Sequence, residues 1–298
     1  MNAFLALKPG DRKLLCQEAR VKLGLGAVSL EKDFWVSWIL RELFAIPGWG
    51  PYLAFKGGTS LSKAWQFIER FSEDIDVVID REFLGFGGER LSRSQLNKLK
   101  ETCALRIREE LVPAFDHRLK SQMPPDDAWT LMLAPPEEDP DQQTLLFHYP
   151  TVFEGESGYV SPVVKIELGA RSEIEPAESR PIRPLLVEAY PDVIGTERVM
   201  VRTVAARRTF WEKVMLIHEE MLRPPEKSRK ARLSRHYYDL WCLIRKGVAR
   251  EAVADSGLFE RVARHRQVFF RYGWMDYSTL VKGRMRIVPP EDQLLIWR

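Results

Sequence analysis

A Gly-Gly turn followed by two spaced aspartates constrains this chain more than any other stretch. The residues from Phe55 to Asp80 read FKGGTSLSKAWQFIERFSEDIDVVID, and the strand-like run at their end carries Asp74 and Asp76. Side chains two residues apart on a strand point to the same face, so both carboxylates should converge on one spot. Because such carboxylates repel each other, the pattern predicts a cation between them, and Mg²⁺ is the usual cation for oxygen ligands.

The glycine turn supplies a second part of this predicted site. Glycines let the backbone approach a ligand closely, and successive amides at a helix start form an anion site. Thr59 and Ser60 bring hydroxyl donors, and Lys63, one turn after Thr59, should project the same way. Both signals have plain alternatives: the glycines can form an ordinary turn, and the aspartates can line the solvated face of an edge strand.

A third carboxylate would complete such a site. In the later stretch VVKIELGA, Val163, Lys165 and Glu167 share one face of a predicted strand, and the other face is apolar, with Val164, Ile166 and Leu168. An unpaired charge in this apolar context is costly, which favours Glu167 as a metal ligand. The alternative is an ion pair between Glu167 and Lys165.

Composition places the chain among ordinary soluble proteins. Its 298 residues are 45% hydrophobic and 29% charged, enough for one large or two modest domains. No apolar run approaches the roughly 20 residues of a membrane span, and the first residues lack the basic region of a signal peptide. The three cysteines match no metal or redox spacing, so we expect reduced structural thiols and a cytoplasmic location.

The order of elements predicts an α+β fold with a mixed β-sheet core flanked by helices, plus a helical C-terminal lobe. We expect helices at 10–24, 29–46, 59–70 and 94–120 and from about residue 207 onward. Strands are expected at 52–56, 74–80, 144–149 and 160–169, with a further candidate at 182–189 and a loop over 121–142. The predicted division is an N-terminal lobe, residues 1–194, and a C-terminal lobe, residues 195–298.

The second predicted helix has Ser29 as its candidate N-cap. The charges of Glu31, Lys32 and Asp33 then fall in its first turn, where we interpret them as helix-end charges.

Charge is distributed unevenly between the two predicted lobes. Residues 195–298 hold 22 lysines and arginines against 12 acidic residues, whereas residues 1–194 hold 23 against 30. A basic lobe beside an acidic one suits a polyanionic partner, although Lys/Arg-rich helix surfaces are the alternative. The stretch from Arg223 to Arg235 is the richest in lysine and arginine. Its candidates for nucleic-acid contact are Lys227, Arg229, Lys230, Arg232 and Arg235.

Three stretches carry a resemblance to a known family. They are EKDFW from residue 31, the central GGTSLSKAW…RFSEDID, and the late FWEKVMLIHEE…RHYYDL. The turn, the spaced aspartates and the later Glu167 strand resemble the nucleotidyltransferase superfamily of DNA polymerase beta. Together the three stretches resemble the AbiEii family of toxins from type IV toxin–antitoxin and phage-abortive systems, which includes the MenT proteins.

The resemblance implies roles for particular residues. Asp74, Asp76 and the strand-placed Glu167 would bind metal, while Lys213 and Asp239 match a late lysine and aspartate that the family needs for activity. The nucleotide would contact Gly57, Gly58, Thr59, Ser60, Lys63, Ser72 and Lys213. Two alternatives stay open: Glu212 and Lys213 can be helix surface charges, and Asp239 can pair with Arg235 four residues earlier.

The implied activity is Mg²⁺-dependent nucleotidyl transfer. Two ions would activate an acceptor hydroxyl and stabilise pyrophosphate as NMP leaves an NTP. The family implies an RNA acceptor, with the tRNA 3′ end favoured, a block of translation, and an AbiEi-type antitoxin. Alternatives are a small-molecule or protein acceptor, and a non-catalytic nucleic-acid-binding relative.

Other common site types are not indicated. His218 and His236 stand in no metal-ligand spacing, so we expect packed or surface roles for them. The sequence contains neither a Walker A motif nor H-E-x-x-H, which excludes P-loop ATPases and the common zinc hydrolases.

Overall fold

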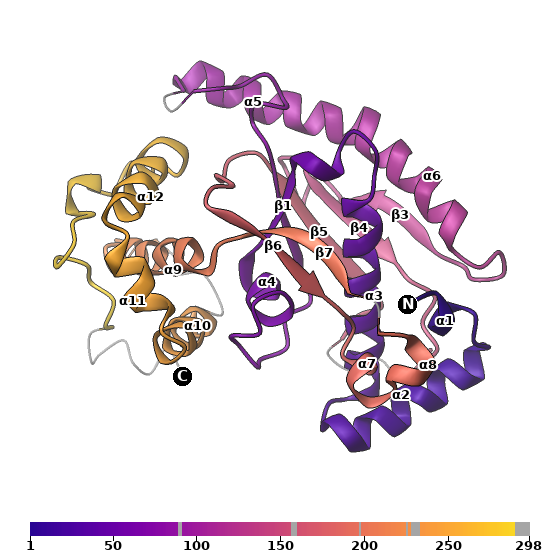
Figure 1. Ribbon diagram of the computed structural model, residues 1–298. Helices are drawn as coiled ribbons and strands as arrows, with labels where there is room; N and C mark the ends of the chain where they lie inside the picture. The colour runs from indigo at the N-terminus through magenta and orange to yellow at the C-terminus, as the bar shows by residue number, and fades with distance from the viewer. Residues whose placement is uncertain (89–90, 156–159, 197, 225, 228–232, 290–298) are drawn as a thin grey trace.

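A mixed β-sheet forms the centre of the molecule (Figure 1). The computed structural model describes residues 1–88, 91–155, 160–196, 198–224, 226–227 and 233–289. Within those residues the sheet has seven strands in the order β3-β4-β5-β2-β1-β7-β6. The strands are β1 Leu53–Lys56, β2 Ile75–Ile79, β3 Thr130–Leu133, β4 Thr144–His148, β5 Val163–Gly169, β6 Ala177–Ile182 and β7 Val199–Val204.

Helices flank the sheet, and the last four gather on one side of it (Figure 1). In the N-terminal part they are α1 Asn2–Leu5, α2 Pro9–Leu23, α3 Ala27–Phe44, α4 Gly57–Lys63, α5 Arg93–Arg106, α6 Val112–Gln122, α7 Leu186–Ala189 and α8 Pro191–Ile194. The last four are α9 Ala206–Met221, α10 Ser234–Arg245, α11 Val248–Ala254 and α12 Ser256–Phe269. The prediction of an α+β fold with a helical C-terminal part is confirmed.

The sheet buries one face much more completely than the other. Alternate residues of β1 and β2, such as Phe55 and Val77, are buried in the main core, against which α3 also packs. Trp35 and Trp38 of α3 lie against Phe147 of β4, with ring centroids 5.9 and 6.0 Å apart. The opposite face has only a small apolar cluster, so it leaves room for polar side chains.

The predicted helix over 94–120 contains an irregular turn. A π-helical stretch, Ile107–Leu111, separates α5 from α6. Pro113 lies two residues beyond its end, and a proline cannot donate the backbone hydrogen bond that a continuous α-helix requires. A π-bulge is a common way to absorb such a defect within a helix.

Several predicted boundaries are wrong. The candidate strand at 182–189 is mostly the short helix α7, and the true strand β6 ends at Ile182. The predicted loop over 121–142 contains β3, an edge strand whose residues are exposed or half-buried. Helix α4 ends at Lys63, well before residue 70, and α3 begins after Gly26 rather than Ser29.

Strand β7 joins the C-terminal part of the chain to the sheet. Its Thr203 lies in register with Phe55 of β1, and β6 pairs with it on the other side. The strand lies beyond the predicted boundary at residue 194, so both predicted lobes contribute to one sheet. The division into 1–194 and 195–298 stays a prediction.

Cys16, Cys103 and Cys242 are all buried and unpaired, which supports structural thiols. In the part of the chain that the structure describes, no helix combines the length and the apolar character of a membrane span.

Candidate active site

The two aspartates and Glu167 lie on the less buried face of the sheet. Asp74 directly precedes β2, and Asp76 lies within it. Asp76 is in register with Glu167 of β5 on one side and with Lys56 of β1 on the other. Three neighbouring strands therefore place a lysine, an aspartate and a glutamate in one row. Asp74, Asp76 and Glu167 all line a cavity of about 280 Å³ between the sheet and α9, α10 and α12.

Burial makes the charges of both aspartates costly. It raises the pKa of Asp76 to about 6, and Glu167 and Asp74 add to this effect while Lys56 opposes it. Burial also raises the pKa of Asp74, again with a contribution from Glu167. Neither aspartate forms an ion pair with any residue that the structure describes. A cation bound here would relieve their mutual repulsion.

Glu167 has a partner of its own. Its carboxylate lies 2.6 Å from Lys165 Nζ, so the alternative ion pair is present. Across the described residues, no group of three His, Cys, Asp or Glu side chains is arranged to hold a metal ion. The donors are nevertheless all oxygen, which is the set that Mg²⁺ prefers.

Gly57 is required by the packing of the turn. It has a positive φ of +79°, and a Cβ atom at this position would lie 1.9 Å from Asp76 Oδ2. A Cβ on Gly58 would lie 2.7 Å from an Arg70 nitrogen. Both glycines line the cavity, so the turn brings its backbone directly against the aspartate.

The hydroxyls after the turn hold the site together from behind. Thr59 Oγ1 donates to the carbonyl oxygen of Asp74 at 2.5 Å and lies 2.8 Å from Ser72 Oγ. Ser60 Oγ donates to the carbonyl oxygen of Gly57 at 2.9 Å. Ser72 lines the cavity, whereas Thr59 and Ser60 are buried outside it. Thr59 therefore positions the backbone of Asp74 instead of facing a ligand.

Lys63 does not project into the cavity, contrary to the prediction. It is buried, and its Nζ lies 2.5 Å from Asp33 Oδ1 of α3. Asp33 Oδ2 also accepts a hydrogen bond from the Leu185 amide at 2.7 Å. The Lys63 ammonium therefore neutralises the Asp33 carboxylate in the core, because a buried carboxylate without a partner would be strongly destabilising.

The interpretation of Glu31, Lys32 and Asp33 as helix-end charges is also wrong. All three are buried in the second turn of α3. Glu31 accepts hydrogen bonds from Thr151 Oγ1 at 2.7 Å and from the Val152 amide at 2.8 Å. Lys32 Nζ lies 2.6 Å from Glu73, next to Asp74. These contacts hold α3 against the segments around Thr151 and Glu73, which lie close to the site.

Helices α9 and α10 supply the opposite wall of the cavity. Lys213 of α9 lines it, and its Nζ lies 2.9 Å from Asp239 Oδ2 of α10. Asp239 is fully buried and also accepts hydrogen bonds from Arg70 at 2.7 and 2.8 Å. Burial alone would raise the pKa of Asp239, but the Arg70 hydrogen bonds and the Lys213 charge hold it below its usual range. The alternative pairing of Asp239 with Arg235 is not formed.

The environment of Lys213 lowers its pKa. Burial is the largest cause, and the neighbouring Asp239 opposes it. Its Nζ also lies 3.3 Å from His236 Nδ1. Burial and the charge of Lys213 lower the pKa of His236 to about 3, so this histidine is neutral at pH 7. His236 lines the cavity as an uncharged neighbour of the lysine, and His218 packs against Thr279.

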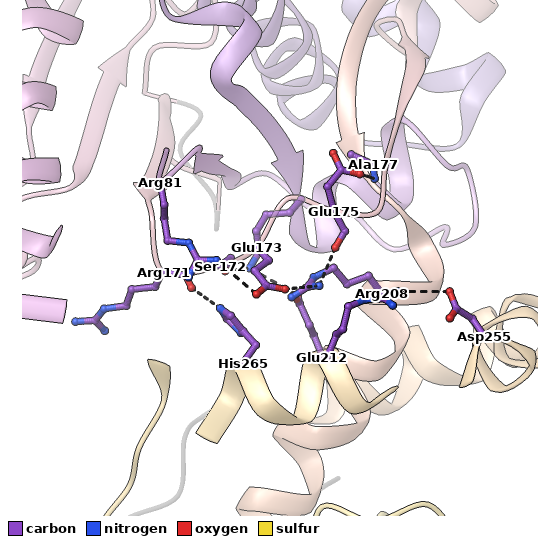
Figure 2. Close-up of polar contacts among 12 residues, drawn as sticks. Arg81, Arg171, Ser172, Glu173, Glu175, Ala177, Arg208, Glu212, Asp255 and His265 are labelled. Atoms are coloured by element: carbon purple, nitrogen blue, oxygen red, sulfur yellow. Dashed lines mark hydrogen bonds and ion pairs between the residues drawn. The ribbon is translucent and has the colours of Figure 1, made fainter. Parts of the chain in front are cut away.

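A second ion-pair network holds Lys56 in place, and sequence reasoning missed it. Figure 2 shows the part of this network that Glu173, Arg208 and Glu212 form. Lys56 Nζ donates to Ser172 Oγ at 2.7 Å and lies 3.7 Å from Glu212. Glu212 in turn accepts from the fully buried Arg208 at 3.1 Å, and Arg208 also lies 3.1 Å from Glu173. The sequence feature that could have identified Lys56 as a site residue is its position at the end of a strand, directly before Gly57 and Gly58. Its partners lie more than 100 residues later.

The predicted basic surface is only partly described. Arg235 is exposed and lines the cavity, and Lys227 is exposed outside it. Arg229, Lys230 and Arg232 lie outside the described residues.

Comparisons with known proteins identify the family of this chain. The family model described as nucleotidyl transferase AbiEii toxin of the type IV toxin–antitoxin system matches residues 38–295. Among solved structures, one match is MenT4, a nucleotidyltransferase toxin from Mycobacterium tuberculosis H37Rv, at 17% identity and a TM-score of 0.37. That match covers 98% of this chain and 100% of MenT4. No curated protein matches the sequence. On the family match, which spans most of its length, the chain belongs to the AbiEii family of nucleotidyltransferase toxins of type IV toxin–antitoxin systems.

Proposed function

We propose that this enzyme transfers NMP from an NTP to a hydroxyl of an RNA acceptor in a Mg²⁺-dependent reaction. The tRNA 3′ end is the favoured acceptor, and its modification would block translation. A cognate antitoxin of the AbiEi type would restrain this activity.

One observation carries the proposal: three carboxylates on the sheet side of the cavity lie opposite a lysine and an arginine on the helical side. The acids of the helical side, Glu212, Glu219 and Glu220, are each paired with an arginine. Asp74, Asp76 and Glu167 lie on the sheet side, and Lys213 and Arg235 lie on the helical side. A metal–triphosphate complex presents the matching pair of charges, because its cation seeks carboxylates and its phosphates seek lysine and arginine.

The residues present fit a divalent metal in their chemistry. Asp74 and Asp76 offer oxygen donors that form no ion pair with a described residue, and burial followed by carboxylate repulsion raises the pKa of Asp74 while burial raises that of Asp76. Glu167 can join them by leaving Lys165, since both side chains are partly exposed. When bound, Mg²⁺ would activate the acceptor hydroxyl and neutralise charge on the leaving pyrophosphate.

The chain's own residues would bind and orient the nucleotide. Lys213 presents a point charge to the triphosphate, and Asp239 positions it through their 2.9 Å contact. Gly57 and Gly58 let the backbone approach the phosphates, and Ser72 adds a hydroxyl at the same wall. Thr59 and Ser60 support this turn from behind.

Incubation of the protein with each labelled NTP and total RNA tests the proposal. We expect label at RNA 3′ ends in Mg²⁺, no label in EDTA, and identification of the acceptor by sequencing those ends. RNA affinity should fall steeply with added salt, because phosphate contacts release counterions. Label in small molecules or protein, with none in RNA, would contradict the RNA acceptor. No transfer to any acceptor would contradict the catalytic proposal.

Gly57→Ala should remove most of the transfer activity. The new Cβ would collide with the Asp76 carboxylate and would also occupy a φ of +79°, which L residues rarely adopt. We expect a loss of about 100-fold or more in kcat/KM and about 1–3 kcal/mol in stability. Gly10→Ala is the matched control, since its Cβ meets nothing within 4 Å. Equal activities of the two variants, measured with labelled NTP, would show that the close approach is unnecessary.

A further inference from the structure

A second and larger cavity lies beside the candidate active site. It has a volume of about 1090 Å³ and runs between the beginning of α5 and the segment after α12, residues 270–278. We call it the α5 groove. Pockets for drug-sized ligands hold about 300–1,000 Å³, so the groove suits an occupant that extends further.

The α5 groove adjoins the candidate active site at two residues. Tyr272 lines both the groove and the active-site cavity. Arg171 lines the groove and also a third cavity, which reaches Asp76 and Glu167. A polymer whose end reached the aspartates would therefore continue into the groove.

The charged residues that line the groove are mostly basic. Four of its lining residues are cationic: Arg93, Lys100, Arg171 and Arg271. Asp276 is the one acidic residue among the described residues that line it. Lys100 and Arg171 share Asp141 as an ion-pair partner. Arg93 and Arg271 are exposed and form no ion pair with a described residue, so they are available to a polyanion.

An aromatic side chain stands where the groove meets the active site. Tyr272 is half-buried and stacks on Trp274, with ring centroids 5.0 Å apart and planes 12° from parallel. Its amide donates to Tyr277 Oη at 3.1 Å, which fixes the segment. Aromatic rings beside a basic groove are how proteins hold unpaired bases without sequence preference.

We propose that the α5 groove binds the single-stranded part of the RNA acceptor next to its reacting end. Arg93 and Arg271 contact phosphates, and Tyr272 stacks with a base near the site of transfer. The identity of the acceptor as RNA rests on the proposed function, whereas the binding surface is read from the groove itself. None of the described residues that line the groove belongs to the predicted basic stretch that ends at Arg235.

The test compares two charge-reversed forms of the full-length protein. Arg93→Glu/Arg271→Glu alters the groove, and Lys246→Glu/Arg250→Glu is the matched control at exposed positions that line neither cavity. Anisotropy of a labelled single-stranded RNA of about 10 nucleotides reports binding. We expect about 10- to 100-fold weaker binding by the groove variant near 0.1 M salt, and a salt slope reduced by about 1.4. NTP binding should not change.

The outcomes separate the groove from the reaction. If the groove variant binds RNA as tightly as the control does, the proposal that the groove binds RNA is overturned. Transfer to RNA by the wild-type protein would in that case still support the proposed function. Selective loss of RNA binding in the groove variant supports the groove even if the wild-type protein transfers nothing to RNA. Tyr272→Phe should bind the RNA with wild-type affinity, and Tyr272→Leu should bind it more weakly. Equal RNA affinities of these two variants would exclude stacking by Tyr272.

Discussion

Asp76→Asn should abolish nucleotidyl transfer while leaving the fold intact. The substitution keeps the shape of the side chain but removes the charge at the centre of the Lys56–Asp76–Glu167 row. We expect at least a 1,000-fold loss of labelled NMP transfer, on the order of what one essential electrostatic group contributes. Asp74→Ala should be similarly inactive, because the two carboxylates act on one spot.

The same substitution should stabilise the metal-free protein. The folded-state pKa of Asp76 is raised to about 6, so its ionised form opposes folding at pH 7. Removing the charge should add about 1–2 kcal/mol, less than the full shift implies because the side chain is partly exposed. The gain should shrink as pH falls through 6 towards 4, where the carboxyl is protonated in both states. Thermal unfolding in EDTA at several pH values measures it.

Asp80→Asn is the matched control for Asp76→Asn. Asp80 follows the same strand but lies outside the active-site cavity, and its carboxylate accepts a hydrogen bond from the Glu82 amide that asparagine can also accept. This variant should retain activity. Wild-type transfer by Asp76→Asn would exclude the aspartate pair from the reaction, and a lower melting temperature would contradict the electrostatic argument.

Strand alternation predicted the acidic wall of the site. A period of two residues placed Asp74 and Asp76 on one face and Glu167 on the corresponding face of another strand. Pairing of β2 with β5 then brought Asp76 into register with Glu167, which no local pattern encodes. The two faces were therefore readable from the sequence, whereas the register depended on the folded sheet.

Buried ion pairs explain most of what the sequence concealed. Lys63 has a helical spacing that suits phosphate contact, but its partner Asp33 lies 30 residues earlier on another helix. Lys56 and Arg70 are fixed by Ser172, Glu212 and Asp239, all distant in the chain. A charge that is paired in the core and one that is free for a ligand look alike in a sequence.

Strand β7 was missed although its signal was present. Val199, Val201 and Thr203 alternate with Met200, Arg202 and Val204, which is the pattern of a strand. Helical periodicity begins shortly after this strand, and the predicted boundary between the lobes, at residue 194, was placed before the strand. The strand matters for the site because α9, which carries Lys213, begins at Ala206 directly after it.

Lys213→Met and Asp239→Asn should both inactivate the enzyme, but only the second should strongly destabilise it. Asp239 is fully buried between two cations, Lys213 at 2.9 Å and Arg70 at 2.7 Å. Removing the lysine leaves Asp239 paired with the arginine. Removing the carboxylate leaves two positive charges facing each other, and an unbalanced buried charge costs about 3–5 kcal/mol. Because Arg70 is partly exposed, we expect a cost of about 2–4 kcal/mol.

Thermal unfolding and transfer assays on the same preparations separate the two roles. Asp239→Asn should lower Tm by about 5–10 °C, and Lys213→Met by no more than about 3 °C. Both should lose transfer by about 100-fold or more, because the lysine is absent in one variant and unsupported in the other. Lys246→Met and Asp192→Asn, at exposed positions outside the cavity, are the charge-matched controls. Full transfer by Lys213→Met would remove this lysine from the proposed site. An unchanged Tm for Asp239→Asn would show that the buried carboxylate does not hold the two cations together.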